Sequence, residues 1–176
     1  MTRPRWIPGP GASGRLKLLL LPLMLLGCQG PVPGTDTPPG DRVLQVGAAP
    51  EVEYLSSPEF LAMDLPFSEA VRVGHTLYLS GQIGNLPGTL ELAPGGIGPE
   101  TRQTLENIRS VLERFGSSLD RVVKCIAMLD DMEEWPAMNE VYVTYFPENR
   151  PARSALGADG LALGARVEIE CIAIVD

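Results

Sequence analysis

The C-terminal segment, residues 167–175, constrains the fold most. It reads Val-Glu-Ile-Glu-Cys-Ile-Ala-Ile-Val, so two carboxylates interrupt an otherwise apolar run. Successive side chains of a β-strand point to opposite faces of the sheet. Glu168 and Glu170 are therefore expected on the face opposite Val167 and Ile169. The segment predicts a strand with one apolar face and one face that carries charge.

A basic side chain, Arg153, follows a proline within the segment Arg-Pro-Ala-Arg-Ser of residues 150–154. Charged residues are rare in buried strands unless a charged or polar partner meets them. Arg153 and Glu168 are therefore the first candidates for a functional site. Spacing alone leaves a simpler alternative open, in which Glu168 and Glu170 face solvent on an ordinary edge strand.

The part of the chain from residue 50 onward has the order of elements of an α+β domain. About 125 residues form one domain with one core. Strands are expected at residues 52–54, 70–73, 76–83, 121–129, 153–156 and 166–175, and helices from residue 99 to 115 and from 132 to 146. Helices in this order pack on one face of a sheet. The other face then needs a partner, which predicts an oligomer.

The first of these helices has the clearest pattern in the chain. Its apolar residues, Leu105, Ile108, Val111, Leu112 and Phe115, recur every three or four positions. Proline at position 99 suits a first helical turn, and the glycine at position 116 is a common stop signal.

Seven short stretches, in order, resemble the reactive-intermediate deaminase (RidA) family of small enamine and imine hydrolases. They are residues 66–74, 77–83, 101–108, 122–124, 139–142, 151–154 and 167–170. The resemblance extends from about residue 52 to residue 176. It implies a chorismate-mutase-like fold, a homotrimer in which three sheets surround a central barrel, and hydrolysis of small 2-imino acids without a cofactor.

The resemblance also implies roles for individual residues. Arg153 would bind the substrate carboxylate with two parallel hydrogen bonds, which a guanidinium does better than an ammonium. Glu168 would position the hydrolytic water and accept its proton. Ser80, Gly81 and Asn139 match residues that line the family's pocket.

Two positions depart from the family pattern. Phe67 stands where a tyrosine is common, so the aromatic ring of this substrate-binding position is kept without its phenol. Ala155 stands where several members have a cysteine. These departures leave an alternative function open, that of a lipid-anchored small-molecule-binding or holdase protein without turnover.

The N-terminal segment reads as an export signal. Four basic residues precede an apolar core at residues 18–26, and Leu-Leu-Gly-Cys at residues 25–28 resembles a bacterial lipobox. Residues 1–27 are expected to be a signal peptide, Cys28 the lipidated residue, and residues 28–49 a flexible tether. The expected location is the cell envelope, on the periplasmic face of the outer membrane in a Gram-negative cell.

Net charge and composition limit the classes of partner that this chain can bind. Without residues 1–27 the chain has ten basic and 22 acidic residues, a net charge near −12. Such an acidic body disfavours nucleic acid as a partner.

The single histidine, His75, lies in an expected turn, and no metal or cofactor site is expected. Cys125 and Cys171 lie in apolar strands. They could pair in an oxidising compartment, but two separate buried thiols are expected, because strand neighbours seldom meet disulfide geometry.

Overall fold

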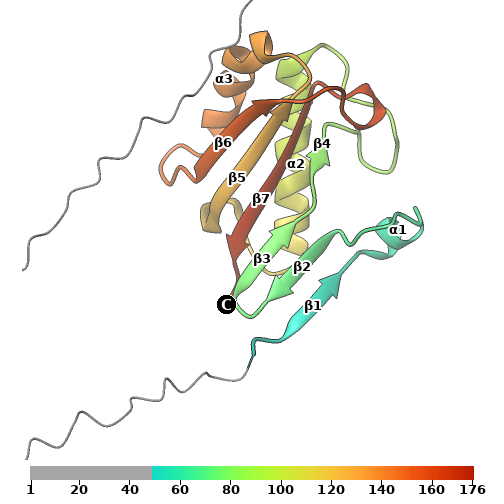
Figure 1. Cartoon of the computed structure of the whole chain (residues 1–176), viewed down its shortest axis with the longest axis vertical. Helices are drawn as coiled ribbons and strands as arrows, with labels where there is room; N and C mark the ends of the chain where they lie inside the picture. The colour runs from blue at the N-terminus through green and yellow to red at the C-terminus, as the bar shows by residue number, and fades with distance from the viewer. Residues whose placement is uncertain (1–48) are drawn as a thin grey trace, which may run out of the picture. The chain divides into compact units, whose positions relative to one another are not determined.

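The computed structural model describes residues 49–176, which form an α+β domain around one mixed sheet (Figure 1). The predicted signal peptide, Cys28 and nearly all of the predicted tether lie outside the described residues. The strands are β1 (Val52–Leu55), β2 (Ala70–Val73), β3 (Thr76–Leu79), β4 (Gln82–Ile83), β5 (Val122–Leu129), β6 (Ala152–Gly157) and β7 (Val167–Ile174). The α-helices are α1 (Pro58–Leu61), α2 (Ile97–Arg114) and α3 (Trp135–Tyr145).

The C-terminal strand lies inside the sheet. The strand order is β1-β2-β3-β7-β5-β6, and β4 also pairs with β7. All pairings are antiparallel except that of β5 with β6, which is parallel. The alternative of an ordinary edge strand for residues 167–175 is therefore wrong, although Glu168 and Glu170 do face away from the core.

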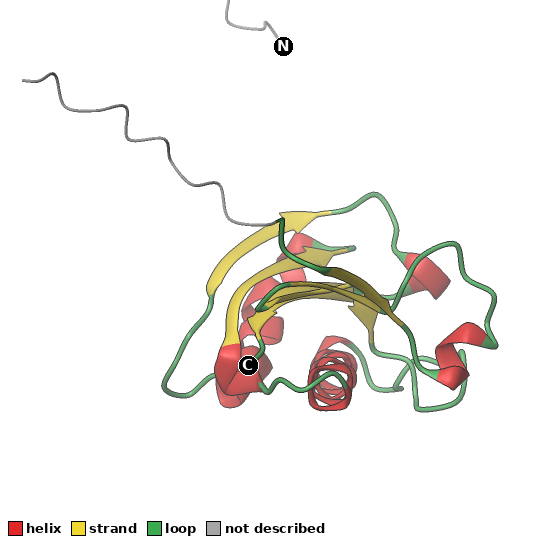
Figure 2. Ribbon diagram, turned by 90° about the horizontal axis from the view of Figure 1, so that it is seen from below, coloured by secondary structure: helices red, strands yellow, loops and turns green. Residues whose placement is uncertain are grey.

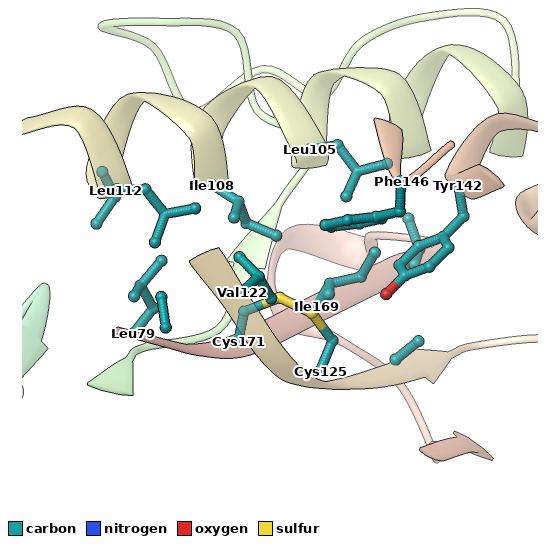
Figure 3. Packing of buried hydrophobic residues seen from close by; sticks show 14 of the residues in the cluster. Leu79, Leu105, Ile108, Leu112, Val122, Cys125, Tyr142, Phe146, Ile169 and Cys171 are labelled. Carbon is teal, nitrogen blue, oxygen red and sulfur yellow. A yellow bond between two sulfur atoms is a disulfide. The ribbon is translucent and has the colours of Figure 1, made fainter. Parts of the chain in front are cut away.

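The helices cover one face of the sheet, as predicted, and α2 lies end-on beneath the curved strands in Figure 2. Leu105, Ile108 and Leu112 of α2 are fully buried. They pack against strand residues such as Leu79, Val122 and Ile169 (Figure 3). The predicted periodicity is confirmed, but α2 begins at Ile97, and the short helix α1 was not predicted.

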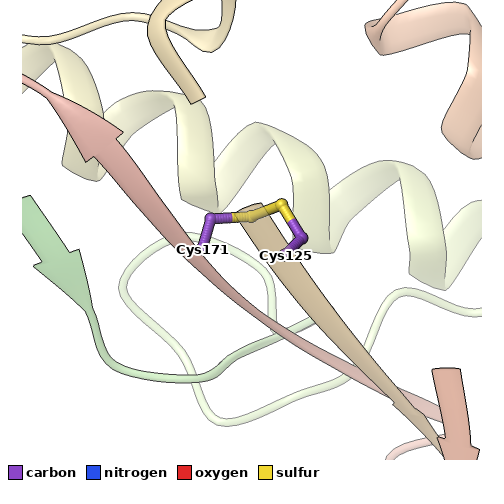
Figure 4. The surroundings of a disulfide bond; sticks show 2 residues. All are labelled: Cys125 and Cys171. Carbon is purple, nitrogen blue, oxygen red and sulfur yellow. A yellow bond between two sulfur atoms is a disulfide. The ribbon is translucent and has the colours of Figure 1, made fainter. Parts of the chain in front are cut away.

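The two strand cysteines correct a prediction. Cys125 and Cys171 are buried, as expected, but they form a disulfide instead of two separate thiols (Figure 4). They stand directly opposite each other in the antiparallel pair of β5 and β7, and their Cα atoms are 4.1 Å apart. A close antiparallel pair brings two β-carbons within bonding reach of a disulfide. The sequence did not fix this register.

Large apolar side chains stand on the face that the helices leave open. They are Tyr54, Tyr78, Leu156 and Ile174, from strands β1, β3, β6 and β7. Scattered exposed apolar residues are ordinary, but a row across one sheet marks a surface that needs a partner. Within residues 49–176, no helix has the length and apolar character needed to cross a membrane.

Candidate functional site

Arg153 forms one half of the site, on the face of the sheet that carries the helices. It stands beside Cys125 in the parallel pair of β5 and β6, so its side chain points toward α3. Its Nη2 atom donates a hydrogen bond to Oδ1 of Asn139 at 2.6 Å. Its guanidinium carbon lies over the ring of Tyr142, 4.4 Å from the ring centroid.

A cavity of about 250 Å³ adjoins this guanidinium. Its lining residues are Asn139, Tyr142, Val143, Phe146, Arg150, Pro151 and Arg153. The cavity combines apolar walls with guanidinium groups, an arrangement that suits a small carboxylate with a short apolar side chain. Only one N–H of Arg153 has a side-chain acceptor among the described residues, so the rest of its fork is free for a ligand.

Glu168 belongs to the second half of the site, on the opposite face of the sheet. In β7 it pairs with Met128 on one side and with Ile83 on the other. Burial raises the pKa of the Glu168 carboxyl, and the neighbouring charge of Glu170 raises it further. A carboxylate with a raised pKa is a better proton acceptor than an ordinary glutamate.

Gly81 makes room for that carboxylate. A β-carbon at position 81 would overlap the carboxylate of Glu168. The break between β3 and β4 falls at Ser80 and Gly81, and the Glu168 side chain lies against Gly81. Glycine is the residue that allows such an approach.

Ser80 is held by backbone acceptors. Its amide donates to the carbonyl of Glu69 at 3.1 Å, and its hydroxyl donates to the carbonyl of Ser68 at 2.7 Å. Phe67 precedes these residues, is half exposed, and meets Phe60 edge to face with ring centroids 5.7 Å apart. The segment that bears Phe67 is therefore fastened to the strand end that bears Ser80.

The buried carboxylate of Glu69 fastens this segment further. Its Oε2 accepts the amide of Ser57 at 2.9 Å, and its Oε1 pairs with the guanidinium of Arg114 from α2. Only 5% of Glu69 is exposed, so these partners replace water. Neither Glu69 nor Tyr142 was among the predicted site residues. For Tyr142 the signal was its position three residues after Asn139, which places both on one face of α3.

A single chain therefore brings the predicted residues together in two groups. Arg153 contacts Asn139 in one group. In the other, Glu168 lies against Gly81, and Ser80 precedes Gly81 in the chain. The register places Arg153 on the same face as Cys125 and Cys171, and the alternation of β7 places Glu168 on the other. The two charged residues do not share a cleft within one chain.

Fold and site define a class: a small α+β protein with an arginine poised for a carboxylate and a partly buried glutamate beside a glycine. Comparison with known proteins identifies the family to which this fold belongs. The model of a family described as endoribonuclease L-PSP matches residues 59–175. The chain belongs to this family, which is the RidA/YjgF family.

Its relatives include proteins that are named as deaminases. A 2-iminobutanoate/2-iminopropanoate deaminase of Mus musculus is 43% identical over 109 residues, which cover 62% of this chain and 81% of the relative. The protein of the same name from Homo sapiens is 41% identical over 109 residues, covering 62% and 80%.

Solved structures give the same fold. A putative endoribonuclease from Thermotoga maritima is 41% identical, has a TM-score of 0.61, and is matched over 64% of this chain and 88% of its own. RidA from an Antarctic Psychrobacter is 40% identical, with a TM-score of 0.60 over 63% and 89%. TdcF of E. coli, solved with bound serine, is 29% identical, with a TM-score of 0.60 over 64% and 90%.

Proposed function

We propose that this protein hydrolyses small 2-imino acids, and the 2-enamino acids in equilibrium with them, to 2-keto acids and ammonia. The observation that carries the proposal is the Arg153 guanidinium, which is held by Asn139 and Tyr142 at the edge of a cavity of suitable size. The deaminase names of the relatives support the same reaction.

The residues divide the chemistry between them. Arg153 holds the carboxylate of the substrate, which places the adjacent C=N carbon. Glu168 orients a water and accepts its proton as the oxygen bonds to that carbon. That proton passes to the nitrogen and gives a carbinolamine. The hydroxyl proton of the carbinolamine is then also transferred to the nitrogen, and ammonia leaves as the C–N bond breaks and the C=O bond forms. No redox step is involved, and water is the only co-reactant.

We infer further that the working site lies between two copies of the chain, in a homotrimer of the kind common in the family. Two observations support this. The halves that bear Arg153 and Glu168 are on opposite faces of one sheet. The face that bears Glu168 also presents Tyr78, Leu156 and Ile174, which a second copy would bury.

We also propose that the protein is exported and anchored by a lipid on Cys28. The lipobox-like sequence at residues 25–28 supports this, and so does the disulfide between Cys125 and Cys171, since disulfides persist in oxidising compartments. In a bacterial host, the full chain should incorporate labelled palmitate and partition into detergent, whereas Cys28→Ala should do neither. A soluble cytoplasmic wild-type product would contradict the proposal.

The activity is tested by competition for a reactive imine. An amino-acid oxidase generates 2-iminopropanoate or 2-iminobutanoate, and semicarbazide traps the imine that survives. The protein should lower the yield of trapped imine, and Arg153→Ala should restore it. Unchanged trapping with both imines, despite measurable binding of pyruvate, would instead make the protein a binding module without turnover. Phe67, which lacks the phenol common in the family, favours that second candidate.

A further inference from the structure

We propose that Tyr142 is a positioning residue for the reaction, and that the face of its ring fixes the Arg153 guanidinium in the orientation that receives the substrate carboxylate. This inference rests on the proposed function, because it assigns Arg153 to carboxylate binding. Tyr142 itself is not placed against the reacting atoms.

Geometry is the first support. The guanidinium carbon of Arg153 lies 4.4 Å from the centroid of the Tyr142 ring, well within the range of a cation–π contact. The Oδ1 atom of Asn139 accepts a hydrogen bond from Nη2, at the edge of the same guanidinium, at 2.6 Å. One contact fixes the plane of the group and the other fixes its rotation within that plane, so together they define where the remaining N–H groups point.

The rigidity of the ring is the second support. Tyr142 is only 5% exposed, and it packs against Phe146 with ring centroids 4.8 Å apart (Figure 3). A buried aromatic side chain has few rotamers available. Arg153 comes from a strand at the edge of the sheet, where a long side chain without such a platform would sample many conformations.

The hydroxyl group of Tyr142 does not account for the position of the Arg153 guanidinium. It is buried and has no hydrogen-bond partner among the described residues. Burial raises the pKa of Tyr142 to about 12, although the charge of Arg153 opposes the rise. The phenol is therefore neutral near pH 7, and the ring face, not a phenolate charge, attracts the guanidinium. The ring and the hydroxyl can accordingly be separated by mutation.

Four variants of the full-length protein make the test. Tyr142→Phe keeps the ring and removes the unpartnered hydroxyl. Tyr142→Met keeps a similar apolar volume without a ring, and Tyr142→Leu replaces it if Tyr142→Met does not fold. The matched control is Tyr145→Leu, one turn further along α3, because Tyr145 also lies beneath an arginine, Arg109, at 5.2 Å but outside this cavity.

The first readout is the NMR signal of the Arg153 side-chain Nε–H, assigned by its absence in Arg153→Lys. A proton held over an aromatic face is shifted upfield, and a fixed side chain has a high order parameter. Both properties should persist in Tyr142→Phe and Tyr145→Leu and be lost in Tyr142→Met. The measurement needs no substrate, so it decides the inference even if the protein hydrolyses no imine.

The second readout is calorimetric binding of pyruvate. Loss of the ring should weaken the Kd by about 3- to 30-fold, the range that a cation–π contact supports. Tyr142→Phe and Tyr145→Leu should bind as the wild type does. An Arg153 signal that stays shifted upfield in Tyr142→Met, or an unchanged Kd in that variant, would overturn the inference, as would an equal loss in Tyr145→Leu.

Discussion

Arg153 and Glu168 stand on opposite faces of the same sheet. Arg153 shares the helix-covered face with the Cys125–Cys171 disulfide, and Glu168 shares the open face with Glu170. One chain thus carries two half-sites that cannot act on one substrate molecule together.

The raised pKa of Glu168 predicts the pH dependence of turnover. The carboxylate is the active form, so protonation stops the reaction, and a raised pKa moves this loss to higher pH than for an ordinary glutamate. The acid limb of kcat/KM should therefore lie above the usual glutamate pKa. Glu170→Gln removes the second cause of the rise and should move the limb toward lower pH. An acid limb at the ordinary value in both proteins would exclude Glu168 as the base.

Glu168→Gln should separate turnover from binding and stability. It removes the base but leaves the Arg153 half intact, so turnover should fall by at least about 100-fold while pyruvate binding persists. A raised folded-state pKa means that the ionised carboxylate destabilises the fold as pH rises through that pKa. The amide variant should therefore not unfold at a lower temperature at neutral pH. Full activity in Glu168→Gln would make this glutamate an ordinary polar surface residue.

Gly81→Ala tests the space beside the Glu168 carboxylate. The new β-carbon would displace the end of the Glu168 side chain, a flexible group, so turnover should fall about tenfold or more with little change in thermal stability. Gly98→Ala in α2 is the matched control, because its β-carbon would meet only Val141 at 4.0 Å. That control should be neutral or slightly stabilising. Equal turnover in the two variants would contradict the placement of Glu168.

Glu69→Gln tests the connection that holds the Phe67 segment. The neutral amide cannot form the ion pair with Arg114, so the buried side chain at position 69 loses its charged partner. The free energy of unfolding should fall by about 1–3 kcal/mol in a denaturant titration. Glu113→Gln, an exposed change on α2, should stay within about 0.5 kcal/mol of the wild type.

The disulfide should contribute to stability. It closes a segment with a sequence separation of 46, and restricting the unfolded chain in this way is worth about 2–4 kcal/mol. Denaturant titrations with and without a reductant should differ by this amount, and Cys125→Ala with Cys171→Ala should remove the difference. Two free thiols in denatured protein taken from the cell envelope would show that the bond does not form there.

Sequence reasoning succeeded where a local pattern decides the structure. The spacing of Leu105, Ile108 and Leu112 fixes a buried helix face, because helical periodicity depends only on near neighbours. The alternation around Glu168 likewise placed its side chain on the correct face. The order of elements was enough to predict helices on one side of a sheet.

Sequence reasoning fell short where the pairing of distant strands decides the structure. Whether Cys125 faces Cys171 depends on the register of β5 against β7, and a shift of one residue would turn the side chains to opposite faces. The face of Arg153 depends on the parallel pairing of β6 with β5 in the same way. The contact of Glu69 with Arg114 joins residues 45 positions apart, so no local pattern announces it.

The most direct test of the account is co-assembly of two inactive variants. Arg153→Ala and Glu168→Gln are each expected to be inactive in the imine-trapping assay. If the site takes Arg153 from one copy and Glu168 from another, mixed oligomers contain intact sites, about one quarter of all sites after random mixing. Unfolding the two variants together and refolding them should then restore about a quarter of wild-type activity, whereas mixing them without exchange of subunits should restore none. No recovery in demonstrably mixed oligomers would contradict a site shared between copies.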